Sequence, residues 1–205
     1  PSGCIVYARV SSNGQKSLAD QLQAGADYAS RRNLPVHKSI TDVGSGRNVA
    51  DAKKLPGYGV LCAEAIKRPG TILVVYDISR LGRCLEVFGV IDVLLKAGVQ
   101  IYSVFEDLLV TSADSGSILR AHKLVVNAIE YSNQLSRRVK DAYAMKKRRK
   151  VFTGTKAPYG FMITVVAGER RLAINSATHK FARRLALTKR NTVKRPEGMS
   201  LWQLQ

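Results

Sequence analysis

Short apolar runs alternate with segments of helical periodicity in the first half of the chain, and this alternation constrains the fold most. The runs expected to form buried strands are Gly3–Val10, 36–41, 71–78 (TILVVYDI) and 99–105. Helices are expected between them, at residues 17–32, 58–67 and 85–96. Strands that alternate with helices predict an α/β fold with a parallel-type sheet flanked by helices.

Polar residues follow two of these strands. Ser11 stands two residues after Arg9 at the end of the first run, and Arg80 and Arg83 follow the run at 71–78. Ligands of parallel sheets bind outside the carboxyl ends of the strands, so residues distant in sequence converge there. We therefore expect the two strand ends to meet, with Ser11 among three arginines.

The residue types around Ser11 indicate which chemistry this edge could perform. A serine hydroxyl is a poor nucleophile unless a base or strong transition-state stabilisation accompanies it. No His stands near Ser11 in sequence and no Gly-x-Ser-x-Gly motif occurs, which disfavours a Ser-His-Asp hydrolase. Guanidinium groups match phosphate oxygens, so the pattern suggests phosphoryl transfer from a nucleic acid to the serine. Taken singly, Ser11 could cap a helix, and Arg80 and Arg83 could form surface ion pairs.

The positive charge of the chain is concentrated in its last third. The net charge is +18, from 33 Lys and Arg and 15 Asp and Glu. The segment from Arg137 to Gln205 holds 18 of the basic residues and three of the acidic ones, or +15. A nearly neutral domain followed by a basic region is expected of a nucleic-acid binder. The alternatives are a basic surface of no special function or a ribosomal-type binding role without chemistry.

Cysteine and histidine give no indication of a metal or a cofactor. The three cysteines are far apart and form no CxxC pair, which argues against disulfides and zinc and fits a reducing compartment. No apolar run approaches a membrane span and no signal peptide opens the chain, so a cytoplasmic protein is expected. The chain begins with Pro1, so either an initiator Met has been removed or the numbering begins inside a longer chain.

Residues 118–150 contain neither Pro nor Gly and carry apolar residues at a spacing of three or four. A helix of about 30 residues would be ~45 Å long, more than a small domain needs to cover its sheet. Such a helix usually packs on a partner, often a second copy. It ends in five basic residues, Lys146, Lys147, Arg148, Arg149 and Lys150. We expect this run to contact phosphates; the alternative is a solvated helix end favoured by the macrodipole.

Three segments are expected from this pattern: an α/β domain at residues 1–117, a long helix at 118–150, and a linker with the start of a further basic domain at 151–205. The last segment contains a predicted β-hairpin at 161–166 and 170–174 and a basic helix at 178–190. Residues 198–205 are typical of the first turns of a further helix, so the sequence is expected to stop inside a domain.

Several motifs resemble those of the serine recombinases, which include resolvases, invertases and large serine integrases. The opening motif is Tyr7-Ala8-Arg9-Val10-Ser11 with Gln15, Ser17-Leu18 and Gln21, and the second motif is Ser79-Arg80-Leu81-Gly82-Arg83. Asp42 with Gly44-Ser45-Gly46 resembles the loop between them, and Glu130-Tyr131-Ser132 with Leu135-Ser136 resembles the dimer helix. The resemblance covers roughly residues 3 to 165. Pro158-Tyr159-Gly160-Phe161 is similar to the start of the DNA-binding region of the large members.

The resemblance implies a site-specific DNA recombinase without a cofactor. Ser11 would be the nucleophile that forms a phosphoserine link to a DNA end. Arg9, Arg80 and Arg83 would bind the scissile phosphate, and Gln15 would support the Ser11 loop. The partners implied are double-stranded DNA and further copies of the chain, as a dimer and as a tetramer in the synaptic complex.

Three positions depart from the family pattern. Ser79 stands where many members carry Asp, Asn133 where an Arg is frequent, and Leu55-Pro56 where an Arg-Pro pair is frequent. The alternative function is therefore a DNA-binding protein of the same fold that no longer cuts. A flavodoxin-like or response-regulator-like domain is a third class, but it predicts a ligand or an acidic cluster where this chain has arginines.

Overall fold

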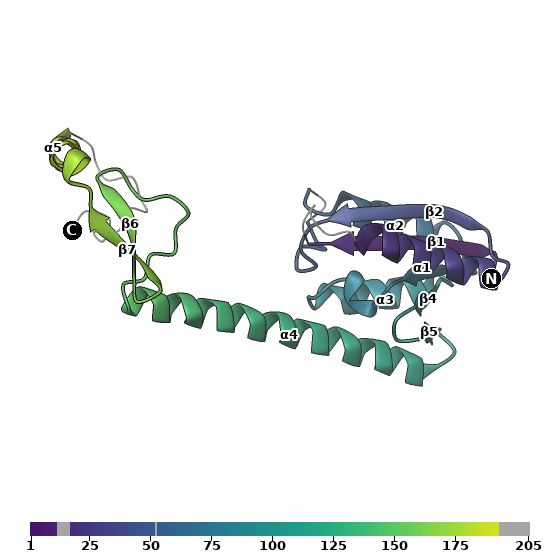
Figure 1. The fold of residues 1–205 in the computed structure, drawn as a ribbon. Coiled ribbons are helices and arrows are strands. Elements are labelled where there is room, and N and C mark those ends of the chain that lie inside the picture. Colours follow the sequence, from purple (N-terminus) through teal and green to yellow (C-terminus); the bar gives the residue numbers. More distant parts are fainter. Residues whose placement is uncertain (12–16, 52, 193–205) are drawn as a thin grey trace. The chain divides into compact units, whose positions relative to one another are not determined.

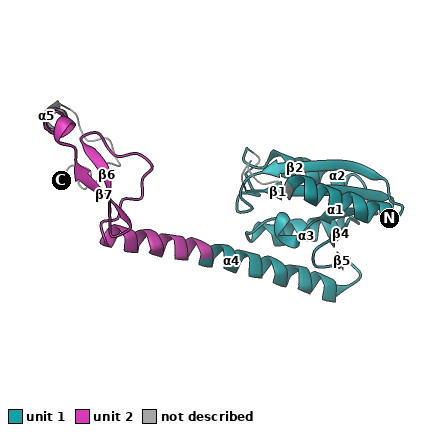
Figure 2. Cartoon of the chain, in the orientation of Figure 1, with its two compact units in different colours: residues 1–134 teal, residues 135–205 magenta. Residues whose placement is uncertain are grey.

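The computed structural model describes residues 1–11, 17–51 and 53–192. The chain forms two compact units, residues 1–134 and 135–205, and the boundary between them falls inside one long helix (Figure 2). Each unit is described separately below.

The first unit is built on a five-stranded sheet of order β2-β1-β3-β4-β5 (Figure 1). The first four strands pair in parallel and β5 pairs antiparallel to β4. Every residue of the central strand β1 is buried, as expected of a parallel strand covered on both faces. The strands are β1 (Gly3–Val10), β2 (Val36–Val43), β3 (Thr71–Val75), β4 (Gln100–Ser103) and β5 (Leu108–Val110). The prediction of a mostly parallel sheet flanked by helices is confirmed.

Alternate residues of the strands contribute to two hydrophobic layers. Cys4 and Val6 face α1 (Ser17–Arg31), where Tyr28 and Ala29 are buried against them. Ile5 and Tyr7 belong to the larger cluster on the opposite face. That cluster also contains residues from α2 (Pro56–Ile66), α3 (Glu86–Lys96) and the start of α4 (Ser115–Arg148). The period of two along β1 therefore assigns its side chains to two different helical layers.

Two details of the sheet differ from the prediction. The run expected as a strand at 71–78 ends as β3 at Val75, and a 3-10 turn, η1 (Ile78–Arg80), follows. The Asp77 side chain accepts hydrogen bonds from Ser79 and Arg80, and such local bonding competes with continuation of the strand. Residues 107–117, for which the apolar pattern predicts neither a strand nor a helix, contain β5. Three residues are too short to show a period in sequence, and β5 is recognised only through its pairing with Ser103, Tyr102 and Ile101.

The long helix is present as predicted, from Ser115 to Arg148. Its buried residues are Ser117, Ala121 and Val125, all in the first three turns. Among the described residues, no helix is long and apolar enough to cross a membrane.

The second unit contains an antiparallel hairpin, β6 (Phe161–Val166) and β7 (Glu169–Ile174), followed by α5 (Ser176–Thr192). The hairpin is confirmed, and its two turn residues, Ala167 and Gly168, both have positive φ, which matches the twist of the strands. The expected helix at 198–205 lies outside the described residues.

Helix α1 approaches β1 so closely that a side chain at Gly25 would collide with the sheet. A Cβ built on Gly25 lies 2.4 Å from Val6 Cγ1. The glycine lowers helix propensity, but the close packing of α1 on the sheet requires it.

We predict that Gly25→Ala lowers the free energy of unfolding by about 1–3 kcal/mol, because the added methyl overpacks the contact with Val6. Urea denaturation of the full chain measures this effect. Gly89→Ala in α3 is the control, since nothing lies within 4 Å of its Cβ position. It should stabilise the chain by up to about 1 kcal/mol through helix propensity. Equal effects at the two sites would contradict the packing argument.

Candidate active site at the strand ends

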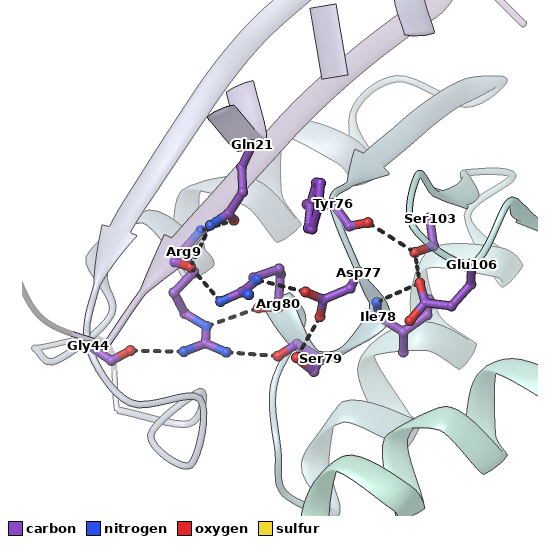
Figure 3. A network of polar contacts seen from close by, with 10 residues as sticks. All are labelled: Arg9, Gln21, Gly44, Tyr76, Asp77, Ile78, Ser79, Arg80, Ser103 and Glu106. Atoms are coloured by element: carbon purple, nitrogen blue, oxygen red, sulfur yellow. Dashed lines mark hydrogen bonds and ion pairs between the residues drawn. The ribbon is translucent and has the colours of Figure 1, made fainter. Parts of the chain in front are cut away.

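The Arg9 side chain is buried at the carboxyl end of β1, with 2% of the residue exposed. Its guanidinium donates three hydrogen bonds to backbone carbonyls (Figure 3). Nε donates to Arg80 O at 3.0 Å, Nη1 to Gly44 O at 2.9 Å and Nη2 to Ser79 O at 2.7 Å. Burial lowers the pKa of Arg9 below its ordinary value, and the nearby charges of Arg80 and Arg83 lower it further. Carbonyl dipoles therefore replace the water around this buried cation.

Arg80, which follows β3, is hydrogen-bonded to Arg9 in both directions. Its Nη1 donates to Arg9 O at 3.0 Å, while Arg9 Nε donates to Arg80 O (Figure 3). Gln21, from α1, bonds both backbone groups of Arg9: Oε1 accepts from Arg9 N at 3.2 Å and Nε2 donates to Arg9 O at 3.3 Å. The structure thus brings Arg9 and Arg80 together although 71 residues separate them.

Asp77 holds Arg80 in place, and the sequence alone did not identify it as a site residue. Its carboxylate accepts a hydrogen bond from Arg80 Nε at 3.0 Å and from Ser79 Oγ at 2.5 Å. The side chains of Asp77 and Arg80 are only 16% and 21% exposed. Glu106 supports the same turn, because it accepts hydrogen bonds from Ile78 N and Ser103 Oγ (Figure 3). This chain has Ser79 where many members of the family carry Asp. Asp77, two residues earlier, contacts Arg80 instead.

The loop after β2 contacts both strand ends. Gly44 N donates to Val10 O at 2.8 Å, and Gly46 O accepts from Arg83 N at 2.7 Å. A Cβ on Gly46 would lie 2.5 Å from Arg9 Nη2, so the absence of a side chain allows the loop to approach the guanidinium. The two glycines, noted in sequence as part of a loop motif, are contact points of the site.

Asp42, at the end of β2, fixes the base of this loop. It is buried, and its carboxylate accepts from Tyr7 Oη at 2.9 Å and from Gly57 N at 2.8 Å. Burial raises the pKa of Tyr7 well above its ordinary value, and Asp42 raises it further. The phenol therefore stays protonated and acts as a hydrogen-bond donor. Tyr7 packs in the sheet core, with its ring edge-on to Tyr58.

Ser11 is the exposed member of the predicted set, whereas Arg83 is half-buried like Arg80. Ser11 is exposed and follows the last residue of β1 directly. Arg83 is half-buried, and no described residue accepts a hydrogen bond from its guanidinium. Its backbone N donates to Gly46 O, and Gly46 lies against the Arg9 guanidinium, so the Arg83 backbone is near Arg9. Gln15 lies outside the described residues. The edge thus combines an exposed hydroxyl with guanidinium groups suited to a phosphate.

The basic run lies in the second unit, with Lys146, Lys147 and Arg148 in the last turn of α4 and Arg149 and Lys150 directly after it. Lys147 and Lys150 line a cavity of about 850 Å³ together with Arg171 and Phe152. Arg149 differs from its neighbours because it forms an ion pair with Glu169. Among the described residues, no group of three or more His, Cys, Asp or Glu side chains could hold a metal ion.

The chain matches the family model for the resolvase N-terminal domain over residues 4–151. No curated protein matches it. The solved structures similar to it include the N-terminal catalytic domain of TP901-1 integrase, a resolvase family site-specific recombinase from Streptococcus pneumoniae, and a serine recombinase from Sulfolobus solfataricus. The identities are 22%, 17% and 24%, and the TM-scores are 0.49, 0.47 and 0.42. The matches cover 67%, 72% and 66% of this chain and 98%, 99% and 86% of the others.

We predict that Arg9→Met lowers the free energy of unfolding by about 2–5 kcal/mol, because the part-buried carbonyls of Gly44, Ser79 and Arg80 lose a charged donor. Urea denaturation measures the loss.

Arg83→Met is the matched control, since it removes the same charge from a half-buried side chain without described acceptors. Its effect should stay within about 0.5 kcal/mol. A loss at Arg83 as large as that at Arg9 would mean that the carbonyl contacts do not explain the stability of this edge.

Proposed function

We propose, from the premise that the chain belongs to the resolvase family of serine recombinases, that it cleaves and rejoins DNA at specific sites through a phosphoserine at Ser11. Family membership supports site-specific recombination as the reaction class. The observation that carries the finer proposal is the reciprocal contact of Arg9 and Arg80, which brings two arginine-bearing strand ends to the edge where Ser11 is exposed.

The step proposed is an in-line displacement at phosphorus. Ser11 Oγ forms a bond to the phosphorus, and the bond to the 3′ oxygen of the neighbouring deoxyribose breaks. The hydroxyl proton leaves Ser11, and the leaving oxygen takes up a proton. The reverse step reseals the strand. Because the phosphoserine ester keeps the energy of the broken phosphodiester bond, ATP is not needed. Charge on the phosphate oxygens is stabilised by preorganised guanidinium groups.

The three arginines differ in what they can contribute. Arg9 already donates to three carbonyls, so its proposed contribution is mainly its charge and the placement of Arg80. Arg80 is held by Asp77 through Nε and contacts Arg9 O through Nη1. Arg83 has no described acceptor, so it is the arginine proposed to contact the phosphate most directly. Gln15 is proposed, from the family motif, to support the Ser11 loop.

The alternative is a DNA-binding protein of the same fold that no longer cuts. Its basis was three departures from the family pattern, at Ser79, Asn133 and Leu55-Pro56, of which Ser79 stands in place of a frequent Asp. The Asp77 carboxylate contacts Arg80 at 3.0 Å and so offers a carboxylate to that arginine from another position. This favours an active enzyme over the alternative.

DNA binding and self-association are proposed for α4 and the segment that follows it. Lys146, Lys147, Arg148, Arg149 and Lys150 would contact DNA phosphates. Tyr131, Leu135, Val139 and Tyr143 recur every four residues along α4, and each is between 47% and 64% exposed. Such a stripe is suited to packing against a second copy, in a dimer and in a synaptic tetramer. Residues 1–117, 118–150 and 151–205 would then act as catalytic domain, dimerisation helix and start of a DNA-binding domain.

Incubation with a nicked suicide substrate tests the chemistry. The wild-type chain should form a covalent protein–DNA adduct, and mass spectrometry should locate the phosphodiester on Ser11. Ser11→Ala should abolish the adduct because the nucleophile is absent. Ser30→Ala, which removes an exposed hydroxyl from α1, is the control and should leave adduct formation unchanged. A wild-type chain that binds DNA but forms no adduct at any concentration would support the non-cutting alternative.

The salt dependence of DNA binding tests the basic run. Lys147→Gln and Lys150→Gln should each lower the slope of log K against log salt concentration by about 1, because each removes one phosphate contact. Arg149→Gln is the matched comparison within the same run. It should lower the slope by clearly less, because Glu169 already pairs with its charge. Fluorescence anisotropy over a salt series gives the slopes. Equal slopes for all variants and the wild type would exclude this run as a DNA contact.

A further inference from the structure

Arg47, in the loop between β2 and α2, is hydrogen-bonded to helix α4. Its Nε donates to Ser132 Oγ at 3.0 Å, and its Nη2 donates to Ser132 O at 2.7 Å and to Asn133 Oδ1 at 3.3 Å. All three residues belong to the first unit. The planar guanidinium holds several acceptors in a fixed geometry, which a lysine ammonium would not do.

The other side of the same loop contacts the strand ends. Gly44 O accepts from Arg9 Nη1 and Gly44 N donates to Val10 O, the residue before Ser11. Gly46, next to Arg47, accepts from Arg83 N at 2.7 Å. Gly46 also lies against the guanidinium of Arg9, as the 2.5 Å between its Cβ position and Arg9 Nη2 indicates. One short loop therefore touches Arg9, Arg83 and the residue that precedes Ser11.

We propose that Arg47 is a positioning residue, which fixes the loop at residues 44–47 to helix α4 and thereby places Arg9 and Arg83 for the reaction. The proposal rests on the proposed function, which assigns Arg83 to direct contact with the phosphate and Arg9 to supplying charge and placing Arg80. Arg47 itself is exposed. It is the last residue of this loop and hydrogen-bonds to Ser132 in α4.

A purely structural surface contact would behave differently from a positioning contact. Exposed polar contacts usually contribute little to stability, so losing this one would leave the chain folded. Small displacements of groups that align a reaction, in contrast, slow it strongly even when they arise far from the chemistry. Both possibilities predict a nearly unchanged free energy of unfolding. Only a positioning contact predicts a lower cleavage rate at saturating DNA.

The test uses the full chain and the nicked suicide substrate. Arg47→Ala should lower the cleavage rate at saturating DNA by about tenfold, while the DNA concentration for half-maximal rate changes by less than about twofold. The double variant Ser132→Ala/Asn133→Ala keeps the Ser132 carbonyl and should show a smaller loss. The triple variant should be no slower than Arg47→Ala, because residues that act through one contact are non-additive. Arg31→Ala, which removes an exposed arginine from the end of α1, is the control and should react at the wild-type rate.

Three results would overturn the proposal: an unchanged rate in Arg47→Ala, multiplicative losses in the triple variant, or a change confined to the half-maximal DNA concentration. The last would make Arg47 a DNA contact instead.

Hydrogen exchange separates this proposal from the proposed function. In Arg47→Ala the amides of Gly44 and Arg83 should exchange at least about tenfold faster, and the core amide of Val6 should not change. If the wild-type chain forms no adduct, the proposed function fails. Faster exchange would then still support the loop attachment, and unchanged exchange would overturn it.

Discussion

The structure of the site depends on a single buried cation. Arg9 occupies the end of the central strand, where burial would be very costly for an unpartnered guanidinium. No carboxylate is paired with it by a described ion pair; three backbone carbonyls from two distant segments surround it instead. Carbonyl oxygens stabilise the charge without neutralising it, so the positive potential remains available at the edge of the sheet.

Several local features are consequences of this arrangement. Carbonyls at Ser79 and Arg80 reach Arg9 because β3 ends at Val75 and the chain turns in η1, and Asp77 stabilises that turn. The position of Gly46 requires glycine, because a Cβ there would collide with the Arg9 guanidinium. Gln21 fixes the backbone of Arg9 from α1, so the position of the strand end does not rest on the loops alone. The same contacts that stabilise the fold thus place the arginines.

The division between rigid and exposed groups suggests how stability and chemistry are separated. Arg9 and Asp42 are buried and fully engaged with other residues, whereas Ser11 is exposed and Arg83 half-buried. The groups proposed to contact the phosphate, Ser11 and Arg83, are therefore closer to solvent than the buried, hydrogen-bonded Arg9 and Asp42. Arg47 connects the loop beside these residues to α4 by hydrogen bonds. The exposed apolar stripe of α4 is proposed to pack against a second copy of the chain.

The sequence by itself determined the α/β class, the long helix and the hairpin, because these follow from the spacing of apolar residues along the chain. It also identified Arg9 and Arg80, since Arg9 stands at the end of the first apolar run and Arg80 two residues after the run at 71–78. Only the tertiary structure decided the roles of Asp77, Gly46 and Arg47, and the presence of β5. Their partners lie elsewhere in the chain or in a turn that propensity does not reveal, so their contacts exist only once the strand ends have met. Arg9 is bonded to backbone carbonyls, because a buried charge takes the acceptors that the fold supplies, and its contact with a phosphate stays a prediction.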